Sequence, residues 1–409
     1  MTVALALRVF FAWNYASHNP QRALGTIPFL FESGNIAHSL AEGKGFASPF
    51  RVDTGPTAWI TPLYPLLIAG IFRIFGVYTF AAFVAAISLN ILASAAACIP
   101  VYSIGRSVGG TAVGAGAAWL WAIFPNAILL AVESVWDASI AALLAAVALW
   151  ATLKLGESRR VRAWMGYGLL WGLIALTNAT LVAAMPFLIA WAAWRARRER
   201  RPWAGRAALA VGVAALCCVP WTVRNYRVFH AFVPLRSVLG LQLYMGNSEL
   251  ARDVWKGEGH PIRDTEERAK YVEMGEISYM REKRRLAEEY MVSHPEREWH
   301  LISRRFVAVW SGGTTDPVGY FSEGHSLWSR AVLVFNLAAG VGALLGIVVL
   351  FWKRSEYAVP LAAFPVVVPW AYYLTLALPR YRLPVDPMVM LLDAVAVWGM
   401  VTLGPRVRV

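Results

Sequence analysis

The chain has 409 residues, of which 58% are hydrophobic and 15% are charged, and its formal net charge is +13. A soluble domain usually carries about 25% charged residues, so this composition excludes a soluble globular protein and predicts a polytopic membrane protein. Long continuous runs of Ala, Leu and Val favour helices over the alternating strands of a barrel. Because Lys and Arg gather at the ends of these runs, we interpret the positive charge as a topology signal and expect no nucleic-acid partner.

We expect an all-α fold with about ten spanning helices, since a bilayer needs about 20 apolar helical residues for each span. Basic clusters follow several of the runs, at Arg106, 159–162, 195–206 and 353–354. All of them fall on one side if the N-terminus lies there too, and the positive-inside rule makes that side the cytoplasm. The predicted spans lie at about 1–17, 81–104, 110–131, 138–155, 163–177, 180–195, 205–223, 329–352, 357–377 and 385–403.

The first run carries Arg8 and has no basic cluster before it, so it is a poor signal peptide, which leaves open a start codon further upstream. The later run at 59–75 is ambiguous. Counting it as a span would move basic clusters outside, and it contains Pro62 and Pro65, so we predict a helix in the outer membrane interface. The predicted division of the chain is a core at 1–223 with a first outer loop at 18–80, an outer segment at 224–328 with a helix at 264–291, and C-terminal helices at 329–409.

The first outer loop contains the most informative acid. Glu32 is followed by small polar residues, Ser33-Gly34-Asn35, and His38 lies within two helical turns. A carboxylate just outside a bilayer can act as a general base on an acceptor hydroxyl or amine. The alternative is a solvated charge at a helix end, and Asp53 is the rival acid in this loop.

A second acidic pair lies between two predicted spans. Glu133 and Asp137 are four residues apart, so on a helix they would share one face at the outer mouth. Acids at the membrane edge are functional candidates. The alternative is an acid that only complements the dipole of a helix N-terminus.

Arg380-Tyr381-Arg382 lies in a proline-bounded turn between the last two spans, on the predicted outer side. Two arginines there oppose the usual charge bias, which favours a phosphate ligand, because the guanidinium fork matches phosphate oxygens. The alternative is snorkelling to lipid headgroups. Arg224-Asn225 and Asn247 add weaker polar signals near the membrane and are also compatible with ordinary boundary sequence.

Missing motifs narrow the chemistry. The chain has no Walker sequence, no HExxH and no GxSxG, so no nucleotide-driven cycle is indicated. Its three cysteines lie inside apolar runs and imply neither a disulfide nor a metal framework. Energy for synthesis on the outer side must therefore come from an activated lipid.

Together these features resemble the GT-C superfamily of integral-membrane glycosyltransferases, and in particular the family 39 group of protein mannosyltransferases and aminoarabinose transferases. The resemblance rests on the first-loop acid, the acidic second loop and the order of four short motifs: Gly43-Lys44-Gly45-Phe46, Pro62-Leu63-Tyr64-Pro65, the segment at 220–226 and the turn at 380–384. It implies an enzyme of the bacterial cytoplasmic membrane that uses a polyprenyl-phosphate sugar on the extracytoplasmic side. The family's first-loop acid, usually Asp, would fall on Glu32, and its second on Glu133 or Asp137.

We therefore expect an inverting glycosyltransferase in which Glu32 activates the acceptor and Arg380, Arg382 and Arg224 neutralise the lipid phosphate. The acceptor is a glycan, a lipid or a protein, and membrane lipids are further partners. No cofactor is implied, and a divalent cation is the one candidate left open. The main alternative is a lipid-sugar flippase, which usually shows two related halves that this chain lacks. The predicted substrate-binding residues are Arg380, Tyr381, Arg382, Arg224, Asn225, Asn247, Tyr64, Trp59 and His38.

Overall fold

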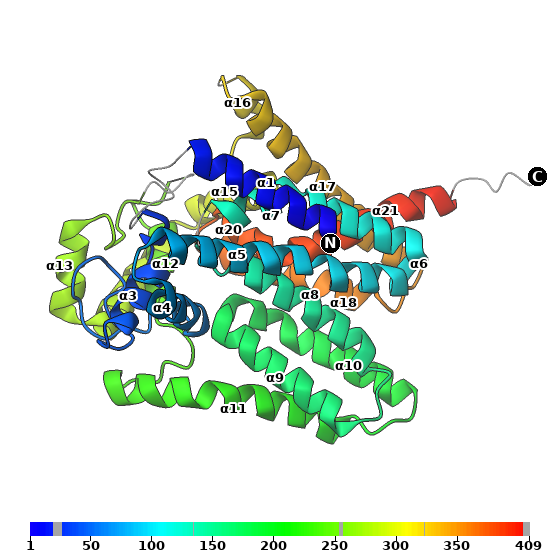
Figure 1. Cartoon of the computed structure of the whole chain (residues 1–409), viewed down its shortest axis with the longest axis horizontal. Helices are drawn as coiled ribbons and strands as arrows, with labels where there is room; N and C mark the ends of the chain where they lie inside the picture. The colour runs from blue at the N-terminus through cyan, green and yellow to red at the C-terminus, as the bar shows by residue number, and fades with distance from the viewer. Residues whose placement is uncertain (19–26, 134, 253–256, 323, 404–409) are drawn as a thin grey trace, which may run out of the picture.

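The computed structural model describes residues 1–18, 27–133, 135–252, 257–322 and 324–403. Within these ranges all regular structure is helical, apart from an isolated bridge between Ala47 and Pro56. The long helices run side by side, and short helices gather at one end of the bundle, at the left of Figure 1. The predicted all-α polytopic membrane fold is confirmed.

Every predicted span overlaps at least one helix of the bundle, but fewer helices are long enough to cross a bilayer unaided. In the described ranges six segments are long and apolar enough: Phe80–Ile123, Ala138–Leu155, Ala179–Arg198, Ala204–Phe229, Leu327–Trp352 and Pro379–Thr402. The count of ten stays a prediction. The bundle helices are α1 (Thr2–His18), α5 (Phe80–Ala96), α6 (Cys98–Ile123), α7 (Pro125–Val132), α8 (Ala138–Leu155), α9 (Val161–Thr177), α10 (Met185–Arg198), α11 (Ala204–Phe229), α17 (Leu327–Trp352), α18 (Ala358–Val367), α19 (Trp370–Tyr373) and α21 (Asp386–Leu403).

Small side chains hold the centre of the bundle together. Helix α8 buries Ala141, Ala142, Ala145 and Ala146 completely, and it packs against α5, α6, α9, α10 and α21. Without a hydrophobic driving force between helices in lipid, close packing of small residues is what favours helix association. The alanine-rich sequence of α8 therefore predicts its central position.

The basic loops meet at the end of the bundle opposite the short helices. Arg195 at the end of α10 pairs with Glu157 after α8 at 3.2 Å and with Glu356 before α18 at 2.9 Å. Arg206 of α11 donates to the carbonyl of Arg159 at 2.9 Å. The structure thus brings the predicted basic clusters together on one side, which the positive-inside rule assigns to the cytoplasm.

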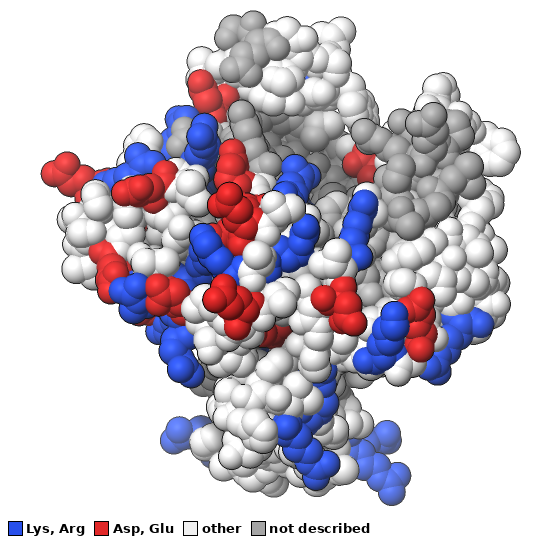
Figure 2. All heavy atoms as spheres, turned by 90° about the vertical axis from the view of Figure 1, so that its left-hand side faces the viewer, with Lys and Arg blue, Asp and Glu red and all other residues white. Residues whose placement is uncertain are grey.

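The other end carries the short helices and most of the acidic residues. Lys and Arg side chains lie among these acids, so both signs of charge gather on this face (Figure 2). Helix α4 has 13 residues, too few for a span of about 20, as expected for the interfacial run. The single helix predicted at 264–291 is wrong, because Gly275 adopts φ 74° and divides it into two helices. The elements here are η1 (Ile27–Phe29), α3 (Glu32–Ala41), α4 (Leu63–Phe75), η2 (Ala179–Ala184), α12 (Leu239–Gly246), α13 (Thr265–Met274), α14 (Glu276–Ser293), α15 (Pro295–Ser311), α16 (Pro317–Ser322), α20 (Pro379–Arg382) and η3 (Leu383–Val385).

A buried carboxylate joins the first outer loop to the later outer segment. Glu276, at the start of α14, accepts hydrogen bonds from the Thr57 hydroxyl at 2.5 Å and the Ala58 amide at 2.8 Å. It also accepts from the hydroxyls of Ser237 at 2.6 Å and Tyr271 at 2.7 Å. Four donors satisfy the charge of this acid, so the two outer segments form one packed unit.

Candidate active site

A cavity of about 420 Å³ opens at the outer end of the bundle. Its walls come from segments that are far apart in the sequence: the start of α3, the turn before α8, the junction of α9 and η2, the loop before α12, the loop before α13, and α20. Apolar residues of α12 and of the stretch after α19 line one side. The charged and titratable residues that line it are Glu32, Asp137, Arg236, His260, Arg263 and Arg380, together with the tyrosines Tyr64, Tyr372 and Tyr381.

Glu32 is held rigidly at the cavity wall. It begins α3, and a side chain at Gly34 would collide with the Phe29 carbonyl, so only glycine allows α3 to lie this close to η1. Asn35 donates to the Pro49 carbonyl at 3.0 Å and ties α3 to the following loop. The Glu32 side chain is 13% exposed, and its Oε1 lies 3.3 Å from Nε2 of His260.

Burial by itself would raise the pKa of the Glu32 carboxyl. The interaction with His260, followed by a backbone hydrogen bond at Glu32 and the charge of Arg380, outweighs burial and brings the pKa of Glu32 below its usual value. Glu32 is therefore ionised at neutral pH, which is the form that accepts a proton.

Asp137 is the second acid in the cavity, and its surroundings act in the opposite direction. Its Oδ2 accepts from Nδ2 of Asn178 at 3.1 Å. Burial raises the pKa of Asp137, although Asn178 and Arg380 partly counteract it. Two acids with oppositely shifted pKa values in one cavity are typical of an active site with divided acid and base roles.

The predicted shared helical face of Glu133 and Asp137 is wrong. Glu133 caps the end of α7, whereas Asp137 directly precedes α8, so the two carboxylates belong to different helix ends. Glu133 is exposed and is not among the residues that line the cavity. Of the two candidates for the second-loop acid, the geometry favours Asp137.

Two arginines from different segments line the cavity, and the charges of both act on Asp137. The guanidinium carbon of Arg380 lies 3.9 Å from the centre of the Trp136 ring, a cation–π contact that fixes its direction. Beside it, the Tyr381 ring stacks on Tyr372 with centroids 4.8 Å apart. Arg236 donates to the Thr180 hydroxyl at 3.3 Å. Both guanidinium groups lie where an anionic group in the cavity would meet them.

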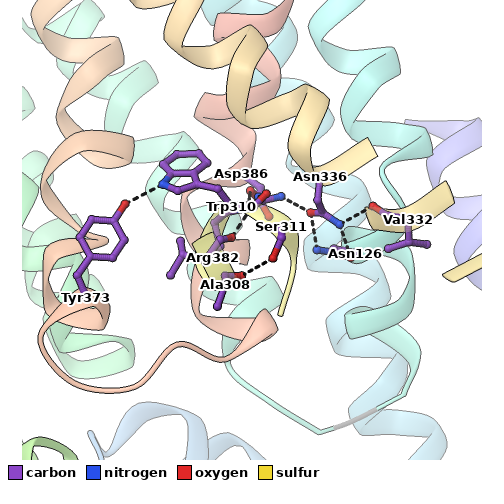
Figure 3. A network of polar contacts seen from close by, with 10 residues as sticks. Asn126, Ala308, Trp310, Ser311, Val332, Asn336, Tyr373, Arg382 and Asp386 are labelled. Atoms are coloured by element: carbon purple, nitrogen blue, oxygen red, sulfur yellow. Dashed lines mark hydrogen bonds and ion pairs between the residues drawn. The ribbon is translucent and has the colours of Figure 1, made fainter. Parts of the chain in front are cut away.

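Arg382 lies in a polar network with Asp386, Trp310 and Asn336 (Figure 3). Its side chain is 2% exposed, and its Nε pairs with Asp386 at 2.7 Å. It also donates to the Trp310 carbonyl at 2.9 Å and to Oδ1 of Asn336. Because these partners occupy its donors and it does not line the cavity, the structure does not support the prediction that Arg382 itself contacts the donor.

The other predicted substrate residues divide into two groups. Trp59 and Tyr64 line the cavity. Arg224 instead donates to the carbonyls of Thr57 and Phe46, each at 2.6 Å, and so anchors the first loop to α11. The remaining three lie outside the cavity and have local partners: Asn225 donates to Val233, Asn247 to Leu374, and His38 pairs with Glu42.

Asp53, the rival first-loop acid, is far from this chemistry. Its Oδ1 accepts from the Ser48 hydroxyl at 3.0 Å and the Gly55 amide at 3.2 Å. It lines a separate hollow of about 310 Å³ together with His38 and Lys44. Its hydrogen bonds indicate a turn-stabilising role.

Sequence reasoning missed His260, Arg236, Asn178 and Trp136. Asn178 interrupts an apolar run and ends α9, and a polar helix break within a membrane run is a signal that marks binding sites. Gly257-x-Gly259-His260-Pro261 has the composition of a tight turn, since Gly259 adopts φ 70°. Arg236 and Trp136 stand alone in their segments, and nothing in the sequence distinguishes them.

In the part of the chain that the structure describes, no three His, Cys, Asp or Glu side chains gather as a metal ion would require. Glu32, Asp137 and His260 share the cavity without forming such a group.

The helix arrangement defines a polytopic membrane fold shared with oligosaccharyltransferases. Over 96% of its length the chain resembles AglB, the oligosaccharyltransferase of Archaeoglobus fulgidus in complex with an inhibitory peptide and a dolichol-phosphate, with a TM-score of 0.55 and 17% identity. It resembles the Archaeoglobus fulgidus enzyme in complex with Zn and sulfate over 94% of its length, with a TM-score of 0.52 and 14% identity. The chain spans about half the length of these enzymes, 50% and 48% respectively.

Residues 59–223 match the family of dolichyl-phosphate-mannose-protein mannosyltransferases. ArnT from Cupriavidus metallidurans bound to undecaprenyl phosphate shows a TM-score of 0.39 and 13% identity over 93% of this chain and 74% of its own. No curated protein sequence matches. The family match and the shared fold confirm the predicted resemblance to the GT-C superfamily, and the chain is an integral membrane protein.

Proposed function

We propose that this protein is an inverting glycosyltransferase that takes a sugar from a polyprenyl-phosphate donor at the extracytoplasmic face of the bacterial cytoplasmic membrane. The observation that carries the proposal is one cavity lined by a carboxylate whose pKa lies below its usual value, Glu32, and by two arginines, Arg236 and Arg380. A transferase family matches residues 59–223, and AglB, which shares the fold, is described in complex with a dolichol-phosphate.

The lining of the cavity suits a lipid that carries a phosphate. Leu239 and Leu243 of α12, with Leu374 and Leu376 after α19, provide an apolar wall at the membrane edge. Such a wall favours a prenyl chain, because burial of its carbons contributes about 25 cal/mol per Å². Arg380 and Arg236 would hold the phosphate, since guanidinium groups bind its oxygens through paired hydrogen bonds.

In the proposed reaction Glu32 accepts the proton of an acceptor hydroxyl or amine. The acceptor oxygen or nitrogen forms a bond to the anomeric carbon while the bond from that carbon to the phosphate oxygen breaks and its electron pair leaves with the phosphate. Attack on the face opposite the phosphate inverts the anomeric configuration. Arg380 and Arg236 stabilise the charge that develops on the leaving phosphate.

The test is incubation of purified protein with radiolabelled polyprenyl-phosphate sugars and cell-envelope acceptors. We expect acceptor labelling or donor hydrolysis, and a loss of about 10²–10⁴-fold in Glu32→Gln, the usual contribution of a general base. Asp53→Asn is the matched control, because its carboxylate lies in the other hollow, and it should stay active.

A flippase is the alternative class, and the match to a transferase family gives it no support. Proteoliposomes separate the two. Movement of labelled donor across the bilayer by wild type and Glu32→Gln alike, with no sugar transfer by either, would replace the transferase proposal with transport.

A further inference from the structure

We propose that His260 is a positioning residue that aims the Glu32 carboxylate, leaving one carboxylate oxygen for the acceptor. The proposal rests on the glycosyltransferase function proposed above and assigns a role to a residue on a different outer segment. His260 lies more than two hundred positions further along the chain than Glu32, yet their side chains are 3.3 Å apart between Nε2 and Oε1.

The hydrogen bonds of the imidazole fix which nitrogen carries the proton. Nδ1 of His260 accepts from the backbone amide of Ile262 at 3.1 Å. A neutral imidazole that accepts at Nδ1 carries its proton at Nε2. Nε2 therefore donates to Glu32 and does not compete with it as a base.

The ring has little freedom to turn away. It is 6% exposed and meets the edges of two aromatic rings, Trp59 at 5.4 Å and Phe50 at 6.3 Å between centroids. Its own backbone lies in a tight turn, where the His260 carbonyl accepts from the amides of Arg263 and Asp264, each at 2.9 Å. The turn continues directly into α13, since Asp264 caps that helix.

This arrangement assigns the two carboxylate oxygens different tasks. Oε1 faces the imidazole, and the other oxygen is the one available to the acceptor hydroxyl. A donor fixed on one oxygen orients the group and favours its charged form. The other charged groups that line the same cavity are Arg380 from α20, Asp137 before α8, and Arg236 and Arg263 from the outer segment.

Two substitutions separate the role toward Glu32 from the role in the turn. In His260→Asn, the amide oxygen can take the place of Nδ1 and keep the bond from Ile262, but nothing reaches Glu32. In His260→Gln, the amide nitrogen can take the place of Nε2 and donate to Glu32, but the acceptor for Ile262 is lost. His300→Asn, at an exposed position of α15, is the matched control.

The readout is the pH profile of kcat/KM, whose acid limb reports the essential base of the free enzyme. Loss of the donor removes an interaction that lowers the pKa of Glu32, so the limb should move to higher pH by about one unit in His260→Asn. It should stay at its wild-type position in His260→Gln and His300→Asn. An unmoved limb in His260→Asn, or a shift in His260→Gln alone, would overturn the proposal.

A second measurement does not depend on transfer. The carboxylate infrared band of Glu32 is obtained by subtracting the spectrum of the Glu32→Gln counterpart from the spectrum of each protein. When this band is followed against pH, its midpoint should move to higher pH in His260→Asn, as the acid limb does. If the wild type transfers no sugar, the proposed function fails, while this titration still decides whether His260 acts on Glu32. An unchanged band in His260→Asn would show that the two residues are neighbours only.

Discussion

Arg380 and Arg382 are two residues apart in one turn, and the structure predicts opposite consequences for their removal. Arg380 faces the cavity over Trp136. Arg380→Ala should remove a charged hydrogen bond to the donor phosphate, worth about 1.5–3 kcal/mol. At about 1.4 kcal/mol per tenfold change, donor Kd should rise about 10- to 150-fold. Arg380→Lys should also weaken binding, because an ammonium group cannot form the guanidinium fork.

Arg382→Ala should instead destabilise the protein. It would leave the completely buried Asp386 without its ion-pair partner at 2.7 Å, a change that typically costs about 3–5 kcal/mol. It would also remove the donor to the Trp310 carbonyl and leave Asn126 as the remaining donor to Oδ1 of Asn336. The consequence is a lower thermal midpoint and less folded protein, with near-normal donor Kd in the fraction that remains folded.

The assay is equilibrium binding of labelled polyprenyl-phosphate sugar to each purified variant in nanodiscs, paired with a thermal unfolding curve. Polyprenyl phosphate without sugar should compete with the donor in the wild type, because the phosphate supplies the charge. Unchanged Kd in Arg380→Ala would place Arg380 among residues that only snorkel to headgroups. A stable Arg382→Ala that no longer binds donor would return Arg382 to the phosphate site.

Three further predictions follow from the outer end of the molecule. Asp137→Asn should lower transfer activity at least tenfold while Glu133→Gln stays near wild type, since only Asp137 lines the cavity; equal losses in a sugar-transfer assay would refute this distinction. Glu276→Ala should lower the free energy of unfolding by about 3 kcal/mol, because four donors lose one buried acceptor. Limited proteolysis should then cut the outer segment, and unchanged resistance to the protease would contradict the role of this acid. Both Glu273 and Arg198 are exposed. In a cysteine-free background, a membrane-impermeant thiol reagent should label Glu273→Cys but not Arg198→Cys in intact spheroplasts. Labelling of Arg198→Cys alone would show that the predicted topology is inverted.

The sequence predicted those parts of the fold that depend on local composition. Apolar runs predicted the bundle helices, and the basic clusters predicted which loops lie together, as the contacts of Arg195 confirm. The prolines and the charge pattern predicted a short helix in the run at 59–75, and α4 has 13 residues; its place in the membrane interface stays a prediction. The break at Gly275 was missed, because helical periodicity continues across it and one positive φ leaves no trace in that pattern.

The site was predictable only where one segment carried an unusual signal. Glu32 and Arg380 stood out because a charge at the outer membrane edge is unusual there, and both line the cavity. Arg382 carries the same signal, yet besides Asp386 four residues on, its partners Asn336 and the Trp310 carbonyl come from other helices, whose packing no single segment reveals. His260 was missed for the same reason, since its value depends on the proximity of Glu32 in space.

The hydrogen bonds that join Glu276 to the first outer loop have a consequence for the synthesis of the protein. The partners of Glu276, Thr57 and Ala58, leave the ribosome 219 and 218 residues earlier, which is about 10–40 s at about 5–20 residues per second. During that interval the Thr57 hydroxyl and the Ala58 amide of the first outer loop lack their acceptor. We expect the loop to be accessible to proteases and chaperones until α14 is made. Completion of α14 supplies that acid, and the cavity is complete only after the later segment at 371–384, which also lines it, has been made.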